Sequence, residues 1–343
     1  MHTPSLSVVI PVRDGGEPFR KVLASIGASE FRDFELIVVD DGSRDDSASL
    51  ALSSGARLFA TARASSGPAA ARNRGAEEAA GRVLCFIDAD CEVHPATLGR
   101  IASAFEDDAA LSALFGSYDD EPAAPNFVAQ YKNLLHHHTH QNGRGEASTF
   151  WAGCGAVRRD FFLKVGGFDP ARYPRPSIED IELGYRMRDA GGTIRLDPSI
   201  TVKHHKAWSL RSLLASDVFD RALPWSRLML GRKHLTNDLN VDARGRLSAI
   251  AALILVLAVC ATPLLHVAAF GAIAAAALLI VLNRSLYGFL LRSRGAWFLV
   301  RALPLHWLYF LYSSAAFGIA SVQTAAAAVW SSELPENGGP SRP

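Results

Sequence analysis

Residues 83–90, VLCFIDAD, place five apolar side chains directly before two aspartates at alternate positions. An unbroken apolar run of this length is typical of a strand buried on both faces, as in a parallel sheet covered by helices. The carboxyl end of such a strand is where an open sheet binds its ligands. Asp88 and Asp90 are therefore predicted to lie at a binding edge, where carboxylates can hold Mg²⁺ or Mn²⁺.

Short apolar runs and helical segments alternate on both sides of this strand. Strands are expected at 6–10, 36–39, 56–60, 111–118 and 193–196, and helices at 18–28, 68–80, 95–106 and 178–190. The alternation predicts an α/β fold with a mostly parallel central sheet, within a catalytic domain at 1–206.

A second acidic pair, Asp40-Asp41, follows the strand 36–39 and precedes a glycine. An acidic pair at one strand end is most often a turn or a cap. Two pairs at two strand ends of the same sheet favour a site for a nucleotide and a metal ion instead.

Composition excludes several other classes of protein. The 343 residues carry a net charge of +1, so no basic surface for nucleic acid is expected. The four cysteines are too far apart for a zinc site or a disulfide framework. His136, His137, His138 and His140 have no cysteine or carboxylate nearby in sequence, so we expect a solvated helix end or an acceptor-side loop there.

The C-terminal part of the chain is far more apolar than the rest. Segment 207–246 interleaves tryptophan and leucine with arginine, which suits either a membrane interface or an ordinary surface helix. Three runs free of Asp, Glu, Lys and Arg follow at 247–265, 266–282 and 303–330, before a tail at 331–343 that we expect to be flexible. About three transmembrane helices are predicted, since a span needs about 20 apolar residues.

Arginines mark one side of these predicted spans. Arg244 and Arg246 precede the first span, and four more arginines lie at 284, 292, 294 and 301, between the second and third. The positive-inside rule makes this side cytoplasmic. We therefore expect a multi-pass protein of the cell (inner) membrane whose catalytic domain is cytoplasmic.

The order of the short motifs carries a family resemblance. They are Val9-Ile-Pro-Val12, Val39-Asp-Asp-Gly-Ser43, Ala71-Arg-Asn-Arg-Gly75, Phe86-Ile-Asp-Ala-Asp90, Gly153-Cys-Gly155 and Glu179-Asp180. Over roughly residues 5–205 the chain resembles glycosyltransferase family 2, whose members have the GT-A fold. The resemblance implies a hexosyltransferase-type enzyme that depends on a divalent cation, Mn²⁺ or Mg²⁺.

The resemblance also implies roles for individual residues on the donor side. Pro11, Val12 and Asp14 would line the base and ribose, and Asp14 departs from the asparagine often found there. Asp40 and Asp41 would bind the base, while Arg72 and Asn73 would close over the nucleotide. Asp88 would contact the ribose or the metal ion, Asp90 would bind the metal ion, and His204 is a candidate further ligand.

The acceptor side is expected around Asp180. A carboxylate opposite the leaving group can take the proton of an attacking hydroxyl, and a helix N-terminus stabilises its ionised form. Asp180 is therefore the predicted catalytic base. Trp151, Gly153, Cys154, Gly155 and Glu179 are predicted to form the acceptor side; a tight strand turn with a core tryptophan is the alternative reading of 151–155.

The expected activity is inverting transfer of a sugar from a nucleoside diphosphate sugar, with UDP as the expected nucleotide, to a hydroxyl group. The apolar C-terminal region favours a lipid or lipid-linked glycan as acceptor. A polyprenyl-phosphate sugar transferase, which needs no base, remains the alternative enzyme, and an inactive membrane scaffold is the alternative without activity. A dehydrogenase is disfavoured, because PVRDGG follows the first strand in place of GxGxxG.

Overall fold

The computed structural model describes residues 3–143, 145–232 and 242–333. These fall into two compact units. The sheet unit contains the chain up to Leu214 together with Arg284–Ala302. The helical unit contains Ala243–Asn283 and the segments that begin at Ala215 and Leu303.

A nine-stranded sheet forms the centre of the sheet unit, in the order β3-β2-β1-β4-β8-β6-β9-β5, with β7 also paired to β9. β1 to β4, β6 and β9 run in one direction, and β5, β7 and β8 run in the other. The mostly parallel α/β sheet predicted from the sequence is confirmed. The strands are β1 (Leu6–Val12), β2 (Phe34–Asp40), β3 (Arg57–Ala60), β4 (Val83–Ile87), β5 (Cys91–Val93), β6 (Leu111–Tyr118), β7 (Gly145–Glu146), β8 (Cys154–Arg158) and β9 (Thr193–His204).

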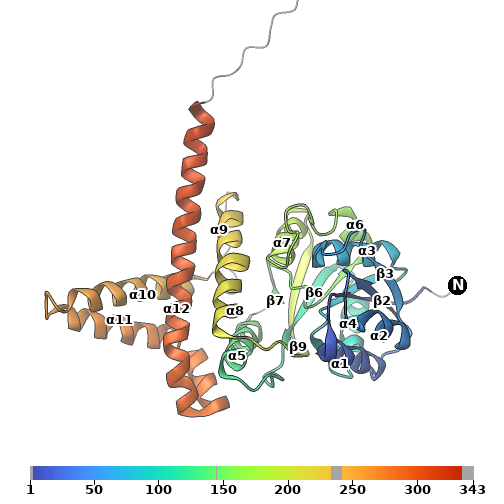
Figure 1. Ribbon diagram of the computed structural model, residues 1–343, viewed down its shortest axis with the longest axis horizontal. Coiled ribbons are helices and arrows are strands. Elements are labelled where there is room, and N and C mark those ends of the chain that lie inside the picture. Colours follow the sequence, from blue (N-terminus) through green and yellow to red (C-terminus); the bar gives the residue numbers. More distant parts are fainter. Residues whose placement is uncertain (1–2, 144, 233–241, 334–343) are drawn as a thin grey trace, which may run out of the picture. The chain divides into compact units, whose positions relative to one another are not determined.

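Helices cover both faces of this sheet (Figure 1). On one face, α1 (Gly16–Gly27), α2 (Ser47–Ser53) and α4 (Thr97–Asp107) contribute buried side chains to a core with Val8 and Ile10 of β1. On the other, α3 (Pro68–Glu78), α6 (Arg159–Lys164) and α7 (Glu179–Asp189) pack against Val9. Successive residues of a strand point to opposite faces, so β1 needs its unbroken apolar run to bury both.

The elements that the sequence did not predict are short or polar. They are α2, α6, β5, β7 and β8, together with α5 (Phe127–Asn142). The side chain of Asn126 begins α5 by accepting a hydrogen bond from the Ala129 N–H at 3.0 Å. The histidine run therefore lies in the C-terminal half of a sixteen-residue helix, which agrees with the expected helix end and not with a loop, and His140 is buried there instead of solvated.

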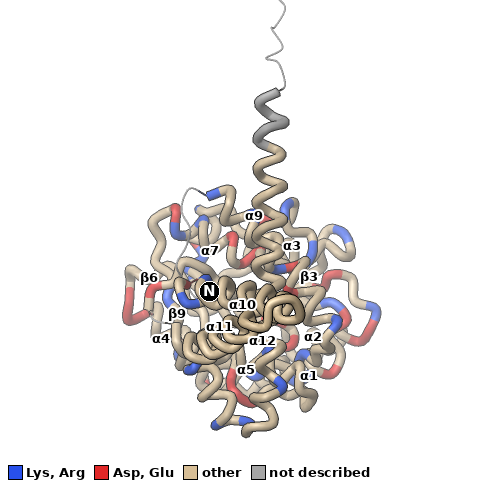
Figure 2. The backbone as a smooth tube through the Cα atoms, turned by 90° about the vertical axis from the view of Figure 1, so that its left-hand side faces the viewer, with Lys and Arg blue, Asp and Glu red and all other residues tan. Residues whose placement is uncertain are grey.

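The described part of segment 207–246 is helical, with α8 (Leu210–Ala215), a π-helical turn (Ser216–Ala222) and α9 (Leu223–Leu230). Then come α10 (Ala243–Ala261), α11 (Ala268–Leu282) and α12 (Arg284–Glu333). Residues 334–343, most of the predicted tail, lie outside the described residues. Beyond Arg301, α12 carries no charged residue before Glu333, and Figure 2 shows its upper part without blue or red.

Two helices among the described residues are long and apolar enough to cross a membrane, Ala243–Ala261 and Arg284–Ala327. This is weak evidence for membrane association, and it does not confirm three spans. α11 has only 15 residues, or about 22 Å at 1.5 Å per residue, against a hydrocarbon core of about 30 Å. Proline at 263 and the turn around it shorten this predicted span from its N-terminal side.

Gly75 sets how closely α3 approaches β1. A Cβ atom at Gly75 would lie 2.3 Å from Val9 Cγ1, whereas one at Gly27, the last residue of α1, would meet nothing within 4 Å. We predict that Gly75→Ala lowers the free energy of unfolding by about 1–3 kcal/mol through overpacking. Gly27→Ala is the matched control and should leave it unchanged or slightly higher. Chemical denaturation of both variants measures this; equal stabilities would contradict the packing argument.

Candidate active site

The predicted acidic residues converge at one edge of the sheet. In the parallel register, Val12 of β1 lies opposite Asp40 of β2, and Val9 lies opposite Phe86 of β4. The segments that leave these three strands therefore start side by side. They carry Asp14, the Asp40-Asp41 pair and the Asp88-Asp90 pair, as the strand pattern predicted.

Asp88, Asp90 and Cys91 form a group whose possible ligand atoms lie within 4.8 Å of one another. The two carboxylates are partly exposed, and the thiol is buried. Burial raises the pKa of Cys91 well above its usual range, and the two carboxylates add to the effect, so the thiol stays neutral. A pair of carboxylate oxygens beside a neutral thiol fits a hard cation such as Mg²⁺ or Mn²⁺.

The electrostatics of the two aspartates differ. Burial raises the pKa of Asp88; Arg72 opposes this rise, and the charge of Asp90 adds to it. Burial also acts to raise the pKa of Asp90, but His204 and Lys206 outweigh it, so the pKa of Asp90 lies below its usual range. Two neighbouring carboxylates repel each other, and a cation bound between them would relieve that repulsion.

His204 lies beside this pair. Its Nε2 is 3.6 Å from Asp90 Oδ2, and β9 places it opposite Cys91 of β5. Its buried ring stacks on Tyr118, with centroids 4.2 Å apart and an angle of 11° between the planes. The structure thus brings the predicted third ligand next to Asp90, and Tyr118 holds its ring in place.

Arg72 occupies a different position from the one that the motif implied. It is only 4% exposed. Its Nη2 lies 2.6 Å from Asp88 Oδ1, and its Nη1 lies 3.0 Å from Glu179 Oε1. Burial disfavours its charge, but the two carboxylates outweigh this and raise the pKa of Arg72. Arg72 therefore links the end of β4 to the start of α7, and its closure over the nucleotide stays a prediction.

Asp180 lies in the first turn of α7 and is partly buried. Its Oδ2 accepts a hydrogen bond from the Ala152 N–H at 3.2 Å. The next residue, Gly153, accepts a hydrogen bond from the Asp88 N–H through its carbonyl at 3.1 Å. Residues 152–153 therefore connect the predicted base to the predicted metal site through backbone groups.

Glu179 is buried. Its carboxylate pairs with Arg72 and accepts a hydrogen bond from the Ser177 N–H at 2.8 Å. Asn73 is also engaged, because its side-chain amide exchanges two hydrogen bonds with the backbone of Phe168, at 2.8 and 2.9 Å. Both side chains therefore hold neighbouring segments in position, and the ligand contacts expected of them stay predictions.

The loops after β1 and β2 are held together by their own acidic residues. Buried Asp41 accepts hydrogen bonds from the Thr61 hydroxyl and from the N–H groups of Ser66 and Gly67, each at 2.8 Å. Asp14 is exposed and accepts one from the Arg44 N–H at 2.7 Å. Asp40 accepts one from the Ser43 N–H at 2.8 Å. Asp41 thus shapes the loop at 61–67, while Asp14 lies at the surface near Pro11 and Val12.

The glycines near Trp151 are required by packing. A Cβ atom at Gly153 would lie 2.5 Å from the Trp151 ring, and one at Gly155 would lie 2.3 Å from the Trp151 carbonyl oxygen. Gly155 and Cys154 are buried in β8. Their place on the acceptor side stays a prediction. Trp151 is only partly buried and remains a candidate contact.

Helix α5 forms a wall of the site that the sequence did not reveal. The rings of His136 and His140 lie 4.8 and 5.6 Å from Trp151, and His136 lies 4.2 Å from Tyr118. Tyr118 in turn meets Trp151 edge-on at 4.9 Å. The spacing of the two histidines, four residues apart, places them on one helical face, and this was the available signal.

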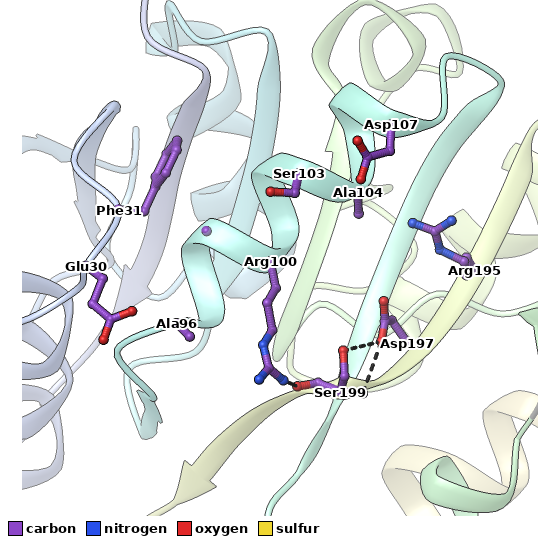
Figure 3. A pocket seen from close by; sticks show the side chains of 11 residues that line it. Glu30, Phe31, Ala96, Arg100, Ser103, Ala104, Asp107, Arg195, Asp197 and Ser199 are labelled. Carbon is purple, nitrogen blue, oxygen red and sulfur yellow. Dashed lines mark hydrogen bonds between the residues drawn. The ribbon is translucent and has the colours of Figure 1, made fainter.

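A hollow of about 630 Å³ lies elsewhere on the sheet unit, along α4 (Figure 3). Arg100 points across it to the carbonyl of Ser199, and Asp197 accepts hydrogen bonds from Ser199. None of its eleven lining residues belongs to the acidic edge, so this hollow is not part of the candidate site.

Comparison with known proteins identifies the sheet unit. Residues 7–166 match the family model described as Glycosyl transferase family 2. Residues 7–166 are a family 2 glycosyltransferase domain. The match covers β1 to β8 and α6, and therefore the Asp88-Asp90 pair; Asp180 and His204 lie beyond it.

Two curated relatives are similar over part of their length. The uncharacterized glycosyltransferase YibD of Escherichia coli K12 is 36% identical over 110 residues, 31% of this chain and 32% of the relative. The pre-mycofactocin glycosyltransferase of Mycobacterium tuberculosis H37Rv is 28% identical over 236 residues, 62% of this chain and 45% of the relative. The chain thus spans a third to a half of the length of these relatives.

One solved structure extends the likeness to most of the chain. S. aureus TarS 1–349, in complex with UDP-GlcNAc, is 13% identical with a TM-score of 0.50, covering 92% of this chain and 89% of that one. At this identity the likeness concerns the fold alone. The sheet unit has a GT-A-like α/β fold.

We predict that Asp90→Asn weakens cation-dependent nucleotide binding without unfolding the protein, because a partly exposed carboxylate is removed and no core cavity opens. Loss of a residue that only hydrogen-bonds to a metal ligand typically weakens metal binding about 10–100-fold. We expect the loss of a ligand to weaken it at least as much. Asp107→Asn, at an exposed position at the end of α4, is the control. Thermal stabilisation by UDP with Mn²⁺ measures binding, and an unchanged Mn²⁺-dependent shift in Asp90→Asn would refute the assignment.

Proposed function

We propose that this chain is an inverting glycosyltransferase that moves a sugar from a nucleoside diphosphate sugar, with UDP as the expected nucleotide, to a hydroxyl group on a lipid or lipid-linked glycan. One observation carries the proposal. The Asp88-Asp90 pair and Asp180 are joined through residues 152–153 and through the Arg72 ion pairs. These contacts support a site in which a donor and a base would be held in a fixed arrangement.

Asp88 and Asp90, with His204 beside them, are the residues that would hold the divalent cation, and the cation would neutralise the diphosphate as it leaves. The loops after β1 and β2 would receive the nucleoside. Exposed Asp14 and partly exposed Asp40 and Pro11 offer polar and apolar surface there. Asp41 supports them indirectly by fixing the loop at 61–67.

Asp180 would take the proton from the acceptor hydroxyl as that oxygen attacks the anomeric carbon. Its position in the first turn of α7 favours the carboxylate form. The ion pair between Glu179 and Arg72 fixes that helical turn, so the base keeps its orientation. Attack from the face opposite the leaving group inverts the anomeric configuration.

A membrane-associated acceptor is supported by the helical unit. Large apolar side chains such as Leu257, Leu264 and Phe270 are exposed on or between α10 and α11. We propose that residues 1–206 act at the cytoplasmic face of the cell membrane, that 207–246 lies at the interface, and that helices within 247–330 anchor the chain. Trp151 would stack on a sugar ring of the acceptor.

The mechanism predicts a selective defect in Asp180→Asn. Turnover should fall about 10²–10⁴-fold, the contribution typical of a general base, while nucleotide affinity stays near normal. Asp189→Asn, at the exposed end of the same helix, should retain activity. Transfer to hydroxyl acceptors and nucleotide affinity are measured for both variants. Near-normal turnover in Asp180→Asn would favour transfer to a polyprenyl phosphate, which needs no base.

The topology proposal predicts opposite locations for residue 292 and the C-terminus. Residues 303–327 reach about 37 Å as a helix, enough for one crossing, and Arg284, Arg292, Arg294 and Arg301 precede them. Reporter fusions should therefore place residue 292 in the cytoplasm and the C-terminus outside. A cytoplasmic report from both fusions would show that α12 does not cross.

A further inference from the structure

Residues Arg284–Ala302 belong to the sheet unit although apolar sequence surrounds them. They follow the apolar helix α11 and precede the uncharged run 303–327. Gly295 interrupts the helix with a φ of 83°, in the left-handed region that favours glycine. The contact pattern groups this segment with the glycosyltransferase domain. We call it the platform segment.

One side of the platform segment is fixed to α5 and its N-terminal approach. Arg294 donates to the Gln130 side chain at 2.9 Å and to the Asp120 carbonyl at 2.7 Å. Phe298 packs edge-on against Phe127 with centroids 5.0 Å apart, and Arg301 lies 4.0 Å over the same ring. Further contacts join Phe289 to His137 and His138, and Ser285 to His138 at 3.1 Å.

Other residues of the platform segment expose apolar and basic groups. Trp297 is 72% exposed, and Leu291 and Val300 are exposed within the same segment. Arg284 and Arg292 are exposed as well. The segment contains four arginines and neither aspartate nor glutamate. Exposed tryptophan with arginine and without acidic residues is typical of a helix that lies in the headgroup region of an anionic bilayer.

Helix α5 connects this surface to the candidate site. The platform segment contacts Phe127, Gln130, His137 and His138 of α5. The same helix places His136 and His140 against Trp151. If the platform segment bound a lipid surface, its contacts with α5 would position that helix, which lines the predicted acceptor side, close to the lipid.

We propose that the platform segment binds an anionic lipid surface through Trp297, Val300, Leu291, Arg284 and Arg292. The acceptor would then reach the predicted acceptor side, next to α5, from that lipid surface. This inference rests on the proposed membrane-associated function and deepens it. It assigns a second lipid contact, in addition to the helices that would anchor the chain, to a segment that packs on the glycosyltransferase domain.

The test uses the full chain in phospholipid vesicles, with exposed Cys260 replaced by serine. Trp297→Cys carries an environment-sensitive fluorophore, and Leu52→Cys, at a 61% exposed position on α2, carries the same label as control. A quencher attached to the upper acyl chain should quench the label at 297 and not at 52. Soluble iodide should show the opposite pattern.

Val300→Cys repeats the measurement with Trp297 intact, and far-UV circular dichroism with thermal unfolding reports folding of each variant. Quenching by lipid at 297 should increase when phosphatidylglycerol is added to phosphatidylcholine, and Arg284→Gln with Arg292→Gln should remove that increase. Equal access of iodide to 52 and 297, or shielding of 297 from both quenchers, would overturn the proposal. The readout requires no sugar transfer, so failure of the proposed reaction leaves it interpretable.

Discussion

The buried guanidinium of Arg72 is the interaction on which the site depends. It bridges Asp88 at the end of β4 and Glu179 at the start of α7, two segments far apart in sequence. A charge this deeply buried is tolerated only when it is paired, and removing one partner of such a pair typically costs about 3–5 kcal/mol. The same guanidinium therefore fixes the carboxylate of Asp88 and the first turn of α7, which carries Asp180.

Around this bridge, the acidic residues divide by burial. Asp41 and Glu179 are buried, and backbone N–H groups or an arginine occupy their oxygens, so they shape loops. Asp88, Asp90 and Asp180 are partly exposed. Solvent exposure thus distinguishes the acidic residues that shape loops from those predicted to take part in the reaction.

The C-terminal region shows a similar division. α10 and α11 expose large apolar side chains along their length, which a protein surrounded by water rarely does over such an area. Arg284–Ala302 instead returns to the sheet unit, where arginine and aromatic contacts to α5 replace purely apolar packing. The segment that follows the apolar helix α11 in sequence therefore contacts α5, the helix whose histidines lie against Trp151.

Sequence alone predicted the parallel sheet and the acidic edge, because unbroken apolar runs separated by helices and carboxylates directly after strands are local properties. It placed Asp88 and Asp90 at that edge, and the family resemblance added Asp180 and His204 to the predicted site. Only the tertiary structure decided that Arg72, Asn73 and Glu179 support the site from within. Their hydrogen-bond partners lie about 100 residues away, a separation that no local pattern encodes. The sequence did not predict the role of α5 for the same reason. Its histidines can be assigned to the site only because the folded chain places them against Trp151 and Tyr118.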